Sequence, residues 1–359
     1  MTRLALLAFA MLTPFCSAAF TISTIAGTGE AGHTGDGAPA TAARIHDPFG
    51  VIRGPDGALW FCEYNGHRIR RIASDGTIGT IAGSGRPDFS GDGGPAIAAS
   101  LSYPHEIRFG PDGHLYVADS GNHVIRRIDV QTGLISTVAG TARKRGYAGD
   151  GGPASAAQFS NPISIQFAPG GDLYVCDIGN HVIRRIDHAT GVVTTLAGTG
   201  KPGPTPDGAP LASTPFDNPR SLDVDRDGNL WLATREGNQV FKLDLRAGVI
   251  RHVAGTGASG FTGHGGPAKE ATLSGPKGIA LDAEGNVWLA DTESHSVRLI
   301  DVRTGMIEWI AGTGAKGDGP DGEARACALN RLHGIFVDTD GAVYIGDSEA
   351  NRVRVIRRQ

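Results

Sequence analysis

The tripeptide Ile25-Ala26-Gly27 is the first of six copies of an aliphatic residue followed by Ala and Gly. The later copies are Ile81-Ala82-Gly83, Val138-Ala139-Gly140, Leu196-Ala197-Gly198, Val253-Ala254-Gly255 and Ile310-Ala311-Gly312. Their alanines stand at positions 26, 82, 139, 197, 254 and 311, so the copies are 56 to 58 residues apart. This regular period indicates one supersecondary unit repeated along the chain, with neighbouring units sharing a continuous core.

The repeat unit is clearest between residues 104 and 161. Segments rich in β-branched and aromatic residues predict short strands at 105–109, 114–119, 123–129 and 134–138. Residues 110–113 (Gly-Pro-Asp-Gly) suit a hairpin turn, because Pro presets φ and Gly accepts a positive φ. A Gly-rich loop at 140–161 leads to the next copy and contains one expected helical turn at 153–157. Six units of four antiparallel strands predict an all-β, six-bladed β-propeller.

The two ends of the chain predict how the ring closes. The last copy has no fourth strand, since its third strand at 353–356 is followed by three residues only. Residues 21–27 read as a fourth strand without a unit of its own. We therefore expect the N-terminal strand to complete the last blade, which removes both exposed edges. Residues 20–359 are expected to form a single domain.

Residues 1–19 have the features of a signal peptide. Arg3 is followed by an apolar run at 4–12 and by the small residues Ser17-Ala18-Ala19, which resemble a cleavage site. The apolar run is too short to span a bilayer. We therefore expect a secreted or periplasmic protein that is not inserted in a membrane.

Charge and cysteine content narrow the function classes. The formal net charge of −4 gives no electrostatic support for binding nucleic acid. Beyond residue 19 the cysteines are Cys62, Cys176 and Cys327, and Cys62 and Cys176 occupy the same repeat position, where other copies have Ala or Gly. We expect them to pack as small buried side chains, and we expect a monomer.

Residues 119–129 (DSGNHVIRRID) and 177–187 (DIGNHVIRRID) resemble the NHL repeat signature. The resemblance extends over the whole chain beyond residue 19, although the fourth copy departs from it at 234–244 (TREGNQVFKLD). It implies a six-bladed propeller of the exported bacterial type. Such propellers commonly serve as interaction platforms, and the group includes a zinc-dependent amidating lyase; related six-bladed propellers include metal-dependent lactonases.

Comparison among the copies assigns several motif residues to structure. An acid at the end of the second strand and an Arg seven residues later form five pairs: Glu63/Arg70, Asp119/Arg126, Asp177/Arg184, Asp291/Arg298 and Asp347/Arg354. The fourth copy has lost both members, with Thr234 and Phe241 in their places, which predicts an ion pair within each other blade. The recurring residues His67, His123, His181 and His295 are expected to satisfy backbone groups in the turns.

Most return loops contain an Asp-Gly pair, such as Asp92-Gly93 and Asp150-Gly151. Asp-Gly suits a turn in which the side chain accepts a backbone hydrogen bond. Calcium is the alternative, but one Asp per loop supplies few oxygen ligands.

Residues that differ between copies are the better candidates for function. The position after the return-loop Pro, at one mouth of the central channel, holds a chemically uneven ring: Phe49, His105, Ile163, Arg220, Lys277 and His333. Glu106 follows at the next position. We expect Arg220, Lys277 and His333 to make one side of this mouth cationic. The candidate ligand-binding residues are therefore Phe49, His105, Glu106, Arg220, Lys277 and His333.

The sequence leaves two functions open. The first is an exported module that binds a protein, peptide or glycan on the loop face and channel mouth. The second is a metal-dependent lyase or hydrolase, of the amidating-lyase or lactonase kind. For that alternative His46, His105 and His333, from neighbouring blades, would hold zinc with an open position. The ring lacks the carboxylates and Asn residues that the lactonase kind would need.

Overall fold

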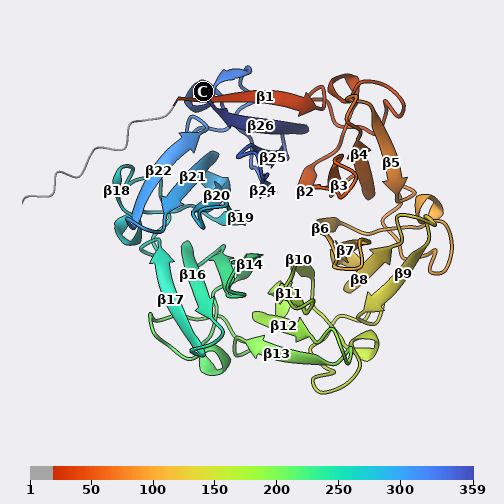
Figure 1. Ribbon diagram of the computed structural model, residues 1–359, viewed down its shortest axis with the longest axis horizontal. Helices are drawn as coiled ribbons and strands as arrows, with labels where there is room; N and C mark the ends of the chain where they lie inside the picture. The colour runs from red at the N-terminus through yellow and green to blue at the C-terminus, as the bar shows by residue number, and fades with distance from the viewer. Residues whose placement is uncertain (1–18) are drawn as a thin grey trace, which may run out of the picture.

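The computed structural model describes residues 19–359, which form six antiparallel sheets arranged in a ring around a central channel (Figure 1). The predicted six-bladed propeller is confirmed. Blades 1 to 3 consist of β2 (Pro48–Arg53), β3 (Leu59–Glu63), β4 (Arg68–Ile72), β5 (Ile78–Ala82); β6 (Pro104–Phe109), β7 (Leu115–Asp119), β8 (Val124–Ile128), β9 (Ile135–Ala139); and β10 (Pro162–Phe167), β11 (Leu173–Asp177), β12 (Val182–Ile186), β13 (Val193–Ala197). Blade 4 consists of β14 (Pro219–Val224), β15 (Leu230–Thr234), β16 (Gln239–Asp244) and β17 (Val249–Ala254).

Blades 5 and 6 have one additional short strand each. They consist of β18 (Gly266–Pro267), β19 (Pro276–Leu281), β20 (Val287–Asp291), β21 (Ser296–Asp301), β22 (Met306–Ala311); and β23 (Gly322–Glu323), β24 (Ile335–Val337), β25 (Val343–Asp347), β26 (Arg352–Arg358), β1 (Phe20–Ala26). In residues 19–359 the helical elements are short 3-10 turns: η1 (Ala40–Ala42), η2 (Ala96–Ala98), η3 (Ser120–Asn122), η4 (Ala154–Ala156), η5 (Ile178–Asn180), η6 (Leu211–Ser213), η7 (Ala268–Glu270), η8 (Thr292–Ser294) and η9 (Ala324–Ala326). The helical turn expected at 153–157 is η4.

The ring closes as the sequence predicts. β1 pairs antiparallel with β26, with Ile22 opposite Ile356 and Thr24 opposite Arg354. Figure 1 shows β1, at the start of the described chain, lying along β26, at its end. The IAG tripeptides therefore mark the outer strands, and the first of them belongs to the last blade.

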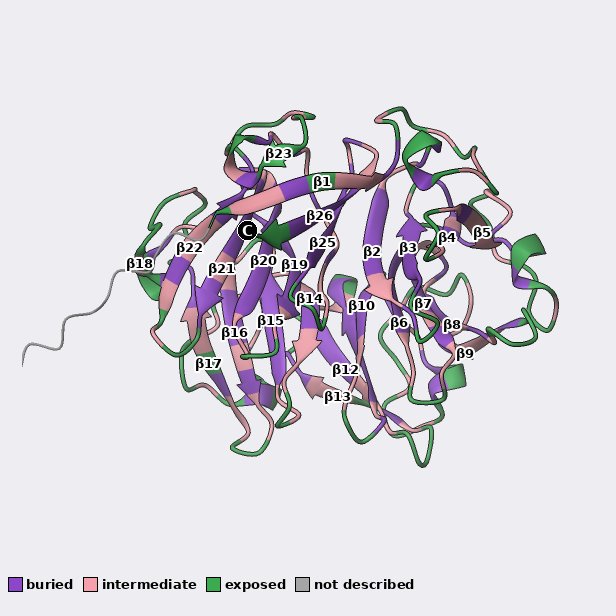
Figure 2. Ribbon diagram, turned by 45° about the horizontal axis from the view of Figure 1, so that its top comes forward, coloured by how far each residue is buried: buried purple, intermediate pink, exposed green. Residues whose placement is uncertain are grey.

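The hydrophobic core lies between neighbouring blades. Each of six clusters of buried side chains contains residues of two adjacent blades; for example, Trp60 and Ile69 of blade 1 pack with Val117 and Ile128 of blade 2. The second strands are buried on both faces (Figure 2). Because every blade needs two neighbours to cover its faces, the closed ring is the arrangement that buries them all.

The predicted ion pairs are present in all five blades. The shortest acid–Arg distances are 3.0 Å for Glu63/Arg70, 3.4 Å for Asp119/Arg126, 3.8 Å for Asp177/Arg184, 3.5 Å for Asp291/Arg298 and 2.9 Å for Asp347/Arg354. In blade 4, Phe241 fills the volume of the Arg side chain and is fully buried.

The return-loop Asp does more than stabilise a turn. Asp92 Oδ1 lies 2.8 Å from Nη2 of Arg126, and Asp36 and Asp150 make the same contact with Arg70 and Arg184. The prediction of a local turn residue therefore missed a second carboxylate for each of these arginines. The contact joins residues more than thirty positions apart, so no local motif reveals it.

The recurring histidines connect blades to one another. Nδ1 of His67, His123 and His295 accepts the backbone N–H of Tyr103, Asn161 and Arg331, respectively, each at 3.2 Å. Each of these donors belongs to the loop that enters the next blade. Asn238 and Asn351 accept the equivalent N–H groups of Gly275 and Asp47 through their amide oxygens. The expected backbone contact is therefore present for three of the four histidines and extends between blades.

The remaining expectations concern cysteines and membranes. Cys62, Cys176 and Cys327 are buried free thiols in the inter-blade clusters. Within residues 19–359, no helix is long and apolar enough to cross a bilayer. The predicted signal peptide, except for Ala19, lies outside the described residues.

Candidate functional site: the Arg220 mouth

The inner strands bring the unrepeated ring together at one end of the channel. Together with Ile163, the sixth member of the ring, five of the candidate ligand-binding residues line a single open pocket of about 280 Å³: Phe49, His105, Arg220, Lys277 and His333. The first four are the second residues of β2, β6, β14 and β19, and His333 precedes β24. We call this pocket, which Tyr64, Arg235 and Arg331 also line, the Arg220 mouth.

Arg220 crosses the mouth to His105, two blades away. Its Nη2 lies 2.6 Å from His105 Nε2. A guanidinium can only donate, so Nε2 must accept, and the ring proton is left on Nδ1 for the backbone of Ile163. Burial, together with the charge of Arg220, holds the pKa of His105 well below its usual value. His105 is therefore a neutral acceptor.

Aromatic side chains pack against one another in the wall of the mouth. Phe49 stacks on His333 with ring centroids 3.9 Å apart and meets His105 edge-on at 4.8 Å. On its other side Phe49 stacks on Tyr64 at 4.4 Å. The expectation that His333 adds positive charge is wrong, because burial and the nearby charges of Lys277 and Arg220 hold its pKa well below the usual value.

Lys277, which is buried, and Arg220, which is partly exposed, differ in their partners. Lys277 Nζ lies 2.7 Å from Glu293 Oε1, and Glu293 also pairs with Arg331 at 2.8 Å. Burial lowers the pKa of Lys277 to about 8 and that of Arg220 to about 10, so both remain charged at neutral pH. Arg220 forms no ion pair with any residue in 19–359. Its Nε is buried without a hydrogen-bond partner.

Glu106 lies one layer deeper than the other candidates. It lines a small cavity of about 20 Å³ below the mouth, pairs with Arg108 and accepts the backbone N–H of Ile165. The alternation of side chains along β6 turns it away from the mouth, so the prediction that it joins the ring at the mouth is wrong.

The three candidate zinc ligands do not form a cluster. His46 is absent from the mouth lining, and its backbone N–H binds Glu63. The rings of His105 and His333 have centroids 6.5 Å apart, Nε2 of His105 binds Arg220, and Nδ1 of His333 binds Ser348. In the described part of the chain, no group of three His, Cys, Asp or Glu side chains is placed to hold a metal ion.

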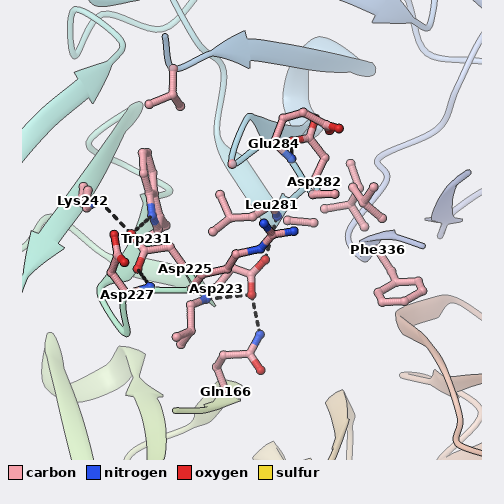
Figure 3. A pocket seen from close by; sticks show the side chains of 18 of the residues that line it. Gln166, Asp223, Asp225, Asp227, Trp231, Lys242, Leu281, Asp282, Glu284 and Phe336 are labelled. Atoms are coloured by element: carbon pink, nitrogen blue, oxygen red, sulfur yellow. Dashed lines mark hydrogen bonds and ion pairs between the residues drawn. The ribbon is translucent and has the colours of Figure 1, made fainter. Parts of the chain in front are cut away.

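The opposite end of the channel has a larger pocket, of about 540 Å³, which we call the Asp223 mouth (Figure 3). Asp223 accepts hydrogen bonds from Gln166 and from the backbone N–H groups of Val224 and Leu281. Asp225 binds the Trp231 indole N–H and pairs with Lys242. These two central carboxylates are thus matched by donors of the chain itself.

Sequence comparison of the copies overlooked part of the Arg220 mouth. The residue before the return-loop Pro is also unrepeated, and it adopts a positive φ in Asp47, Tyr103, Asn161, Asn218, Gly275 and in Arg331 before Leu332. The residue after the acid of the second strand is equally variable and contributes Tyr64 and Arg235. Extending the same comparison to these two positions would have identified Tyr64, Arg235 and Arg331 as lining residues.

Comparisons with known proteins agree with the repeat signature. The NHL repeat family matches residues 101–128 and 273–298. The chain carries NHL repeats. Relatives include the protein SUPPRESSOR OF QUENCHING 1, chloroplastic, of Arabidopsis thaliana (28% identical over 255 residues, 67% of this chain) and NHL repeat-containing protein 2 of Bos taurus (24% over 323 residues, 81% of this chain). The NHL-repeat chain spans only 24% and 43% of their respective lengths.

Solved structures with similar folds belong to proteins of different kinds. An auxiliary nutrient binding protein from Bacteroides thetaiotaomicron has a TM-score of 0.68 at 15% identity, over 95% of this chain and 76% of that one. A gluconolactonase from Xanthomonas campestris has 0.60 at 13% (88% and 87%), and a virginiamycin B lyase from Staphylococcus aureus has 0.53 at 17% (87% and 80%). At these identities the similarity establishes the fold alone.

Proposed function

We propose that the chain is an exported binding module that receives a protein, peptide or glycan ligand at the Arg220 mouth. The observation that carries the proposal is the convergence of unrepeated residues from several blades on one open pocket. Repetition accounts for the buried acids, arginines and turn histidines as structural parts. The mouth residues have no such explanation, and a concave site with an aromatic wall and a few polar groups suits a ligand.

The fold does not distinguish binding from metal-dependent chemistry, because it is shared with an auxiliary nutrient binding protein, a lyase and a lactonase. One contact in the mouth favours binding: a metal at Nε2 of His105 would have to displace Arg220. Stoichiometric zinc in the purified protein would favour the lyase or hydrolase alternative instead.

The test is a screen of the purified chain against glycan and peptide arrays, followed by two alanine variants. Tyr64→Ala removes part of the aromatic wall, whereas Asp227→Ala changes an exposed residue of the Asp223 mouth. We expect the affinity for an array ligand to fall at least about tenfold in Tyr64→Ala and to stay unchanged in Asp227→Ala. The opposite pattern, or equal losses, would contradict a site at the Arg220 mouth.

A further inference from the structure

The arginines of the blade interiors show how this fold normally accommodates a buried guanidinium. Arg126 contacts two carboxylates, Asp119 and Asp92, and donates to the carbonyl oxygen of Ser90. Arg354 contacts Asp318, Asp321 and Asp347. An uncompensated buried charge is strongly destabilising, so these carboxylates are what makes the burial tolerable.

Arg220 lacks that compensation. Within residues 19–359 its hydrogen-bond partner is the neutral His105, which contributes a lone pair but no charge. The guanidinium faces both the mouth and the small cavity beneath it. The missing partner is therefore an anion, and the open pocket is where an anion can enter.

The carboxylates near Arg220 are occupied elsewhere. Among the residues lining the mouth, Arg220, Arg235, Lys277 and Arg331 outnumber the acids Asp47 and Glu349. Glu349 pairs with Lys316 and Arg331, and Asp47 accepts a hydrogen bond from Asn65. Glu293, just outside the lining, is shared by Lys277 and Arg331. Arg235 pairs with Glu236, so Arg220 is the one cation of the lining that has no carboxylate partner within residues 19–359.

The size and the lining of the pocket limit the size and shape of the chemical group to which the anion is attached. A volume of about 280 Å³ is at the small end of ligand pockets and suits a group of about one sugar ring. Tyr64, which lines the pocket and is backed by the stacked ring of Phe49, provides an aromatic surface beside the cationic residues. Such a surface packs against the face of a ring while a guanidinium binds the charged substituent.

We propose that the Arg220 mouth binds a small oxyanion, a carboxylate or phosphate monoester carried on a ring-sized body, with Arg220 as its principal partner and Lys277 as the second cation. The proposal rests on the proposed function, because it names the chemical group that the same mouth recognises. In this proposal Tyr64 packs against the body of the ligand, and the guanidinium of Arg220 binds its charged group.

The test uses matched sugars at constant ionic strength. D-glucuronate and D-glucose 6-phosphate each carry an oxyanion that D-glucose lacks, and their binding is followed through the rise in Tm with concentration. We expect one or both anions to bind at least about tenfold more tightly than glucose. Arg220→Met is expected to abolish this preference. Arg226→Met, which removes the same charge from an exposed residue of the Asp223 mouth, is expected to preserve it.

The two anions distinguish a carboxylate from a phosphate source. The proposal is overturned if neither anion binds more tightly than glucose, or if Arg226→Met weakens binding as much as Arg220→Met does. A ligand found on the arrays that needs Tyr64 but tolerates Arg220→Met would overturn this inference and leave the proposed function standing. Anion binding that needs Arg220, with no array ligand sensitive to Tyr64→Ala, would support this inference and contradict a protein, peptide or glycan ligand at the mouth.

Discussion

Arg126 in the interior of blade 2 and Arg220 at the channel mouth have opposite surroundings. Arg126 is fully buried and contacts two carboxylates. Arg220 is partly exposed in a pocket and contacts a neutral histidine. Arg126 has counterparts in four other blades, whereas Arg220 has none.

This difference distinguishes residues that every blade requires for its packing from residues that occur in one blade only. A residue that recurs in five blades at the same place meets the same packing requirement five times. Blade 4 shows that the requirement is for a filled volume without unmatched charge, since Thr234 and Phe241 replace both members of the pair. An arginine that occurs at this position in one blade only, without an acid to match it, needs another explanation.

The largest effect is expected from Arg126→Met. The substitution leaves the Asp119 carboxylate, which is fully buried, without its cation. Removing one member of a buried pair typically costs about 3–5 kcal/mol of unfolding free energy. Urea unfolding of the variant and the parent protein measures this difference.

The control gives blade 2 the two residues that blade 4 has at the positions of the ion pair. In the double variant Asp119→Thr with Arg126→Phe, the charge is removed together with its partner, so we expect most of the lost stability to return. A double variant as unstable as Arg126→Met would mean that the volume and hydrogen bonds of the arginine matter more than its charge.

The repeat made most of the fold predictable. The period defined six units, the strand patterns defined four strands in each, and the unmatched segment at 21–27 defined the closure with β26. The acid–Arg pairs were predictable because blade 4 lost both members at once. In each case the six copies within one chain could be compared, and each copy has to meet the same physical requirement.

Contacts between units were not predictable in the same way. The Asp92 carboxylate reaches Arg126, and His123 accepts from the next blade at Asn161, through geometry that no local pattern encodes. The mouth posed a further problem, because its residues do not repeat and each is observed once. The ring position was predictable, but the neutral state of His333 and the deeper place of Glu106 depend on burial and strand alternation.

A smaller effect, dependent on pH, is expected at the link between blades 1 and 2. Nδ1 of His67 must be unprotonated to accept the N–H of Tyr103, and burial lowers the pKa of His67 to about 4. In the unfolded chain this residue titrates near 6.5, so the unfolded state binds the extra proton first and stability falls as pH drops from about 6.5 towards 4. The loss attributable to His67 should reach about 1.4 kcal/mol by pH 5.5.

His67→Asn isolates this contribution. Blades 4 and 6 use Asn238 and Asn351 at the equivalent position, with the same positive φ and an amide oxygen as the acceptor. The variant should match the parent protein at pH 7.5 and be more stable by about 1.4 kcal/mol at pH 5.5, as measured by urea unfolding at both values. Equal stability of the two proteins at pH 5.5 would show that His67 does not carry this pH dependence.

The smallest effect on stability is expected from Arg220→Met, the same substitution as in Arg126→Met. Because Arg220 has no carboxylate partner, its removal leaves no charge unmatched, and water in the pocket can replace its hydrogen bond to His105. We expect a change in unfolding free energy of less than about 1 kcal/mol, and a gain in stability is consistent with the desolvation cost of the guanidinium. Urea unfolding at pH 7.5 checks this value beside that of Arg126→Met. A loss of about 3 kcal/mol or more would place Arg220 with the structural arginines and remove the reason to look for an anion at the mouth.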